Sequence, residues 1–311
     1  MVTPLMPMFQ THLASPPLGR RIGLVSGIAS GACYGVMIFL IHILAGWVPA
    51  AEITFLRAFS AVIILLPFII RHRNQWLSRA SRLLWLRSFA GAFSVLCLAW
   101  NLQHTSVGFA NTLFNLAPIL VVILGAVWRQ EQLEVGRFLN IVLVVLASTL
   151  FWYGSRSEAS PVIWVVGLSG MIAASVAYSL LKSVPPLWGP LDITWCLNLA
   201  TLPVSLIFKH GPWIAPFGTI GLLLGAICGL SLIGNALANL SFRSLELSTA
   251  TALIPSCIIW GVLLDVGEHH FPATHGIVGC LLYLVAIVRL AKKPPTANTS
   301  VLANAVIELT D

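Results

Sequence analysis

Ten apolar runs of nearly membrane-spanning length follow one another along this chain, and they constrain its fold more than any other feature. An α-helix needs about 20 residues to cross the hydrocarbon core of a bilayer. Because 58% of the residues are apolar and 9% are charged, the chain has too little polar surface for a soluble protein of this size. The predicted spans are Ile22–Leu44, Ile53–Ile70, Leu83–Leu102, Val107–Trp128, Phe138–Tyr153, Val162–Leu181, Ile193–Phe208, Thr219–Leu240, Leu247–Val266 and Gly276–Leu290. The sequence therefore predicts an all-α polytopic membrane protein.

The chain also repeats itself at about half its length. Segment 22–34 aligns without a gap with segment 166–178, so that Tyr34 coincides with Tyr178. Later aligned pairs are Glu52 with Asp192, Pro118 with Pro255 and Glu131 with Glu268. A repeat of five spans enters the membrane from the opposite side the second time, and inverted repeats are typical of alternating-access carriers. We therefore expect ten transmembrane helices arranged as two inverted five-helix repeats: a tail at 1–21, repeats at 22–156 and 157–291, and a tail at 292–311.

Basic residues orient these spans. If the N-terminus is cytoplasmic, 13 Lys and Arg residues fall on the cytoplasmic side, and only Arg156 and Lys209 fall outside. Cytoplasmic loops carry the excess of basic residues in membrane proteins. The sequence thus predicts a multi-pass protein of the plasma (cell inner) membrane with both termini in the cytoplasm. The basic net charge then reflects topology and contact with the lipid bilayer, so no nucleic acid partner is expected, and a homodimer remains open.

Glycines and prolines mark particular spans. Small residues recur every four positions in the first span, at Gly23, Gly27, Gly31 and Gly35, and in the eighth, at Gly221, Gly225 and Gly229. Such faces let helix backbones approach closely, either as static packing or as surfaces that slide. Pro118 and Pro255 lie near the middle of the matched fourth and ninth spans. Each removes an amide donor and frees a carbonyl, which predicts bent helices around a central site.

Two long stretches carry a family resemblance. TSVGFANTLFNLAPILVVILGAVWRQEQL in the first half and LELSTATALIPSCIIWGVLLDVGEHH in the second share a Ser/Thr-containing helix start, a central proline and a following glutamate. From roughly Ile22 to Leu290, the chain resembles the EamA-type ten-helix family of the drug/metabolite transporter superfamily. The resemblance implies a carrier whose central cavity is lined by helices 1 to 4 and 6 to 9, with helices 5 and 10 at the periphery. The two halves differ where Leu139 of the first half aligns with Gly276 of the second.

Polar side chains deep in the spans are the candidates for contact with a solute, because they are costly in lipid and tend to face the interior. They are Tyr34, Arg57, Asn101, Asn111, Asn115, Tyr178, Asn198, Asn235, Asn239, Thr249 and Thr251. For each amide, a hydrogen bond between helices is an equal alternative. Arg57 either snorkels to the outer headgroups or provides a positive charge for a carboxylate or phosphate. Arg87, one turn inside the third span, is expected to snorkel to the cytoplasmic surface.

Other chemistry has little support in the sequence. The six cysteines lie inside spans without a CxxC pair, which indicates buried side chains rather than disulfides. His269, His270 and His275 offer metal-ligand types near Glu268, but their spacing fits no familiar motif, so neither a metal nor a cofactor is expected. The sequence contains neither an HExxH motif nor paired Asp-rich motifs, so no familiar catalytic motif suggests an enzyme. We expect a secondary transporter of a small metabolite, an amino acid or related organic solute. Its export direction is implied by the resemblance. A channel or facilitator is the alternative, with a membrane enzyme less favoured.

Overall fold

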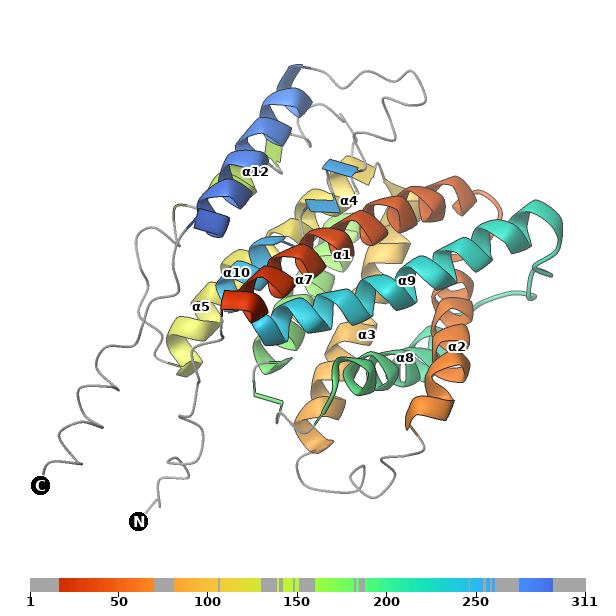
Figure 1. Cartoon of the computed structure of the whole chain (residues 1–311). Coiled ribbons are helices and arrows are strands. Elements are labelled where there is room, and N and C mark those ends of the chain that lie inside the picture. Colours follow the sequence, from red (N-terminus) through yellow and green to blue (C-terminus); the bar gives the residue numbers. More distant parts are fainter. Residues whose placement is uncertain are drawn as a thin grey trace, which may run out of the picture.

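The computed structural model describes residues 17–69, 81–105, 107–129, 139, 142–147, 149–150, 160–181, 183–184, 188–245, 247–253, 256–257, 259–260 and 274–292. Its helices are α1 (Pro17–Leu44), α2 (Ala50–Ile69), α3 (Ser81–His104), α4 (Val107–Asn115), α5 (Ala117–Arg129), α7 (Pro161–Leu181), α8 (Pro190–Ile207), α9 (Gly218–Ser244), α10 (Leu247–Leu253) and α12 (Thr274–Lys292) (Figure 1). Among these residues there is no strand. The predicted all-α class is confirmed.

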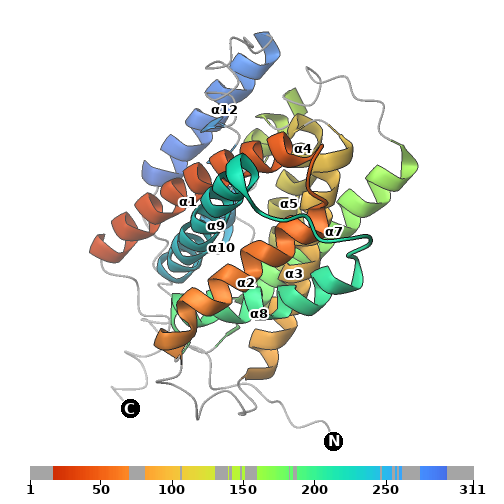
Figure 2. The ribbon, with the colours of Figure 1, turned by 90° about the vertical axis from the view of Figure 1, so that its right-hand side faces the viewer.

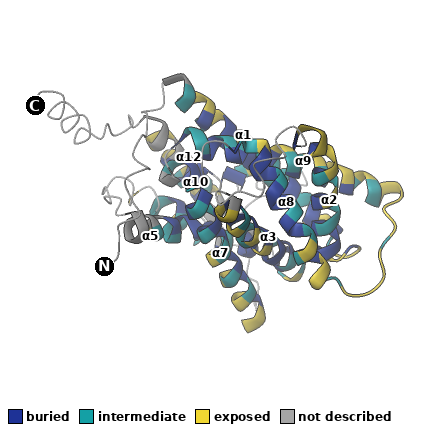
Figure 3. Ribbon diagram, turned by 90° about the horizontal axis from the view of Figure 1, so that it is seen from below, coloured by how far each residue is buried: buried dark blue, intermediate teal, exposed yellow. Residues whose placement is uncertain are grey.

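Six of these helices are long and apolar enough to cross a membrane: α1, α2, α3, α7, α8 and α9. They correspond to the first, second, third, sixth, seventh and eighth predicted spans. Large apolar side chains such as Val25, Val165 and Leu222 are exposed on them, and buried positions face inward (Figure 3). Exposed apolar surface on such helices fits a lipid environment. The count of ten spans remains a prediction, because parts of the fifth and ninth runs lie outside the described residues.

Four pairs of the described helices have the most extensive contacts: α1 with α9, α3 with α7, α2 with α8, and α3 with α8 (Figures 1 and 2). Glycines permit the closest of these approaches. A Cβ atom on Gly23 would lie 2.7 Å from the side chain of Leu245, and one on Gly27 would lie 2.8 Å from the hydroxyl of Ser241. Gly167 and Gly170 of α7 meet α3 with similarly little space. The small-residue face predicted on the first span therefore packs tightly.

The corresponding prediction for the eighth span is wrong at two positions. Gly225 and Gly229 of α9 are exposed, and a Cβ atom on either would have no described neighbour within 4 Å. A Cβ on Gly221 would instead meet the backbone of Pro216 in the preceding loop. The four-residue spacing shows that the glycines share a face, but it does not say whether another helix covers that face.

The fourth predicted span is interrupted. The α4 helix ends at Asn115 and α5 begins at Ala117, with Leu116 in a turn between them. Pro118 occupies the first turn of α5, where a missing amide hydrogen costs no helical hydrogen bond. Its partner in the repeat, Pro255, lies outside the described residues. At the periphery, Tyr283 of α12 packs with Val144 and Ala147 from the fifth predicted span.

Candidate functional site

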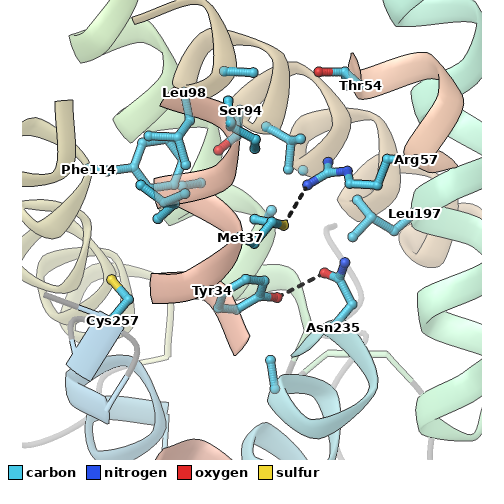
Figure 4. A pocket seen from close by; sticks show the side chains of 18 of the residues that line it. Tyr34, Met37, Thr54, Arg57, Ser94, Leu98, Phe114, Leu197, Asn235 and Cys257 are labelled. Carbon is cyan, nitrogen blue, oxygen red and sulfur yellow. Dashed lines mark hydrogen bonds between the residues drawn. The ribbon is translucent and has the colours of Figure 1, made fainter. Parts of the chain in front are cut away.

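A cavity of about 100 Å³ lies among the helices (Figure 4), several times the volume that one water molecule needs. Its wall is formed by α1, α2, α3, α4, α7, α8 and α9, with Cys257 from the ninth predicted span. The described residues of α12 and of the fifth predicted span contribute nothing to it. This is the division between lining and peripheral helices that the family resemblance implies.

Seven of the eleven candidate side chains line the cavity: Tyr34, Arg57, Asn111, Asn115, Tyr178, Asn235 and Asn239. The other four, which are Asn101, Asn198, Thr249 and Thr251, do not. Asn198 illustrates why, since its amide donates to the Thr194 carbonyl oxygen of its own helix at 2.8 Å. The position of a residue within a predicted span therefore identified polar residues inside the helices, but it did not give the direction in which each side chain faces.

Tyr34 and Asn235 connect α1 to α9 in the cavity wall. The Tyr34 hydroxyl donates to Asn235 Oδ1 at 2.9 Å (Figure 4). Ser30 lies one helical turn before Tyr34 on α1, and its hydroxyl donates to the Gly234 carbonyl oxygen at 2.9 Å. The repeat mate of Tyr34, Tyr178, also lines the cavity, where its ring stacks on Phe242 at a centroid distance of 5.0 Å.

Arg57 lies in the cavity wall and not among the outer headgroups. Its residue is 5% exposed, and its Nη1 donates to the thioether sulfur of Met37 at 3.6 Å (Figure 4). A thioether is a weak acceptor, so this contact compensates little of the guanidinium charge. Of the two alternatives that the sequence left open, the structure favours the charge within the cavity.

Arg87 corrects a prediction. It does not snorkel to the cytoplasmic surface, because it is 5% exposed and lines the cavity. Its Nη2 donates to Asn239 Oδ1 at 3.2 Å, and Asn239 Nδ2 in turn donates to Thr194 Oγ1 at 2.9 Å. A sequence signal for this orientation exists, since the small residues Gly91 and Ser94 follow at i+4 and i+7 and mark one inward face of α3.

The two acids aligned in the repeat lie at helix starts and outside the cavity wall. Glu52, fully buried, forms an ion pair with Lys209 at 3.4 Å, and its Oε1 accepts from the Ile214 amide at 2.8 Å. Asp192 Oδ2 accepts from the Gly189 amide at 2.7 Å. Among the described residues, no Asp or Glu lines the cavity or pairs with Arg57 or Arg87.

The residues of the metal alternative are not placed. His269, His270 and Glu268 lie outside the described residues, and the side chain of His275 is not described either. Within the described part of the chain, no group of three His, Cys, Asp or Glu side chains is arranged to hold a metal ion. All six cysteines are free thiols. Among the described residues, the candidate functional site is therefore the cavity.

Comparison with known proteins shows that the chain is similar to transporters. Residues 21–153 match the EamA-like transporter family. The pseudopaline exporter CntI of Pseudomonas aeruginosa is 27% identical over 283 residues, covering 88% of this chain and 96% of the exporter. An uncharacterized transporter of Helicobacter pylori is 19% identical over 249 residues, covering 77% of this chain and 84% of its own length. A crystal structure with 16% sequence identity superimposes with a TM-score of 0.63, covering 89% of this chain and 97% of the other, which shows a shared fold.

Proposed function

We propose, from the premise that this chain contains an EamA-like transporter family domain, that it is a secondary transporter. It exports a small metabolite, an amino acid or related organic solute, across the plasma (cell inner) membrane by alternating access. One observation carries the proposal. Helices from both halves of the chain enclose a cavity whose wall includes buried arginine and asparagine side chains and half-buried tyrosines, as a solute site near the middle of a carrier requires. The similarity to an exporter supports the direction.

Two inverted repeats, at 22–156 and 157–291, provide the mechanism. Exchanging the halves turns α1 into α7, α2 into α8 and α3 into α9. The pair α1–α9 then becomes α7–α3, and α2–α8 maps onto itself; these are three of the four most extensive pairs, while the fourth, α3–α8, maps onto the smaller α9–α2 contact. Because α1–α9 and α3–α7 are counterparts between the halves, one can loosen while the other tightens, which opens the cavity to alternate sides of the membrane.

Topology gives a first test. A reporter fused after Asp311 is expected to be active only in the cytoplasm, and reporters at Ser157 and Thr274 only outside, because the basic residues gather on the opposite side. Cytoplasmic activity at both loop positions would remove the ten-span arrangement and the inverted repeat together. Parallel fusions after Arg82 serve as the matched cytoplasmic reference.

The transported solute is found by an untargeted comparison of extracellular metabolites from cells that lack or overproduce the protein. At least one small organic compound is expected to accumulate outside in proportion to expression. A channel or facilitator is separated by exchange in proteoliposomes, since unlabelled solute on the opposite side accelerates the flux of labelled solute through a carrier only. No expression-dependent compound in several growth media would contradict the proposal.

A further inference from the structure

We propose that the cavity binds an organic anion bearing two carboxylates, one held by Arg57 and the other by Arg87. This inference rests on the proposed transport function and names the chemical class of its substrate. It begins with the two guanidinium groups, which lie on α2 and α3 and line one cavity. Both residues are 5% exposed, so bulk water does not compensate their charges.

The unsatisfied polar atoms of the cavity wall are all donors. Among the described residues, Arg57 Nε, Arg87 Nε, Arg87 Nη1 and Asn115 Nδ2 have no acceptor. Burying such a group without a partner is unfavourable, and it is more so when the group is charged. A ligand that supplies several acceptor oxygens satisfies these atoms together. A planar carboxylate also matches the paired donors of a guanidinium.

Among the described residues, no carboxylate serves as a counter-ion here. The carboxylate of Glu52, five residues before Arg57 on α2, is held by Lys209 and the Ile214 amide. Asp192 accepts from the Gly189 amide instead. With two positive charges and no described carboxylate in its wall, the cavity is electrostatically suited to a ligand with two negative charges.

The arginines lie at different depths. Gly23 of α1 faces Ser244 of α9, and Cys33 faces Gly234, so these two helices run antiparallel. Arg57 contacts Met37, three residues beyond Tyr34 on α1, and Arg87 contacts Asn239, four residues beyond Asn235 on α9. The arginine contacts thus fall on opposite sides of the Tyr34–Asn235 pair. At 1.5 Å rise per residue they are separated by roughly 10 Å along the helices.

Much of the cavity wall is apolar. Met37, Leu98 and Leu197 line it (Figure 4), and these side chains suit a hydrocarbon chain better than a polar one. Two guanidinium groups whose contact residues are offset by about 10 Å along the helices, in a cavity with a largely apolar wall, fit an α,ω-dicarboxylate more closely than a compact anion such as phosphate.

The first experiment measures binding to the purified full-length protein in lipid nanodiscs, using succinate, glutarate, adipate and pimelate at constant ionic strength. Each diacid is compared with its monomethyl ester. One chain length is expected to bind best and at least about tenfold more tightly than its half-ester, because the ester removes one charged hydrogen-bonding group. Equal affinity of diacids and half-esters would overturn the proposal, as would tighter binding of inorganic phosphate than of any diacid.

Variants then identify the two contacts. Arg57→Gln and Arg87→Gln are each expected to remove the advantage of the diacid over its half-ester, and Arg82→Gln, an exposed arginine on the same helix as Arg87, serves as the matched control. If a Gln variant does not yield folded protein, the Lys variant is measured instead, since it keeps the charge and loses the fork. A diacid advantage of wild-type size in the Arg57 and Arg87 variants would overturn the assignment.

The outcomes separate this inference from the proposed function. Arginine-dependent diacid binding without exchange of labelled diacid in proteoliposomes would leave the anion site standing and contradict transport. Export of a cationic or neutral compound, together with no diacid binding, would leave transport standing and overturn the substrate class.

Discussion

Two groups of buried charges, one that includes Glu52 and one that includes Arg57, each have a member on α2, and the two groups differ in how their charges are paired. At the N-terminal end of α2, Glu52 is paired with Lys209, whose Nζ also donates to the carbonyl oxygens of His210, Gly211 and Pro212. In the cavity, Arg57 donates to the Met37 sulfur and Arg87 to the Asn239 amide oxygen, and among the described residues neither arginine has a carboxylate partner. A charge that is fully paired stabilises a loop against a helix. A buried charge that is left unpaired lowers stability unless a ligand compensates it, which indicates a role in binding.

The largest effect is expected at the unpaired arginines. Arg57→Leu and Arg87→Leu should each lower the rate of export by on the order of 100-fold, because each removes a charged partner of the solute. Lys at either position should retain part of the activity, since it keeps the charge without the planar fork. The measurement is initial rate per folded molecule in proteoliposomes, with membrane abundance followed in parallel. Wild-type rates in a well-expressed Leu variant would erase the distinction between the two groups.

Substitution of the paired charges should lower the stability of the fold more than it lowers the rate of transport. Glu52→Gln leaves Lys209 buried without its counter-ion, and we expect it to lower the free energy of unfolding by about 2 kcal/mol. The three carbonyl oxygens around Lys209 Nζ keep the cost below that of a bare ion. Thermal unfolding in detergent provides the measurement, and Glu52→Gln with Lys209→Met should recover most of the loss. A variant as stable as wild type but inactive in transport would assign Glu52 to the solute path.

The helix break at Leu116 should have a smaller effect on transport. Pro118→Ala permits a continuous helix through this position, which would displace Asn115 from the cavity wall. A displacement of this kind is expected to reduce the rate by about tenfold with near-normal membrane expression. Pro255→Ala is the matched variant in the second half. Full activity in the double variant would show that the two prolines are only tolerated kinks.

Tyr34→Phe should give the smallest change. It removes the hydroxyl that donates to Asn235 Oδ1 but keeps the ring and its packing. A single neutral hydrogen bond corresponds to a change in rate of about threefold to tenfold. Transport rates of Tyr34→Phe and of Tyr178→Phe, its repeat mate, form the comparison. A loss as large as that of the arginine variants would place Tyr34 among the essential solute contacts.

Helix positions were largely predictable from the sequence, and side-chain directions were not. The predicted span 162–181 differs from α7 by one residue, because a run of apolar residues in lipid leaves little choice of conformation. The orientation of Arg87 was missed, because a position one turn inside a helix is compatible with both snorkelling and burial. Gly27 and Gly225 share the same sequence spacing, but only Gly27 faces a partner helix. Which face of a span meets another helix depends on the arrangement of the whole bundle.

Access to the cavity from both sides of the membrane tests the central claim most directly. Ser94, buried in the cavity wall, is changed to Cys in a variant whose six native cysteines are replaced by Ser or Ala. A membrane-impermeant, sulfonate-bearing methanethiosulfonate is then applied to right-side-out and inside-out vesicles. Ser205→Cys, buried in α8 outside the cavity wall, is the control. Alternating access predicts that Ser94→Cys reacts in both vesicle orientations while Ser205→Cys stays unmodified. Reaction of Ser94→Cys from one side only, or from neither, would contradict the account.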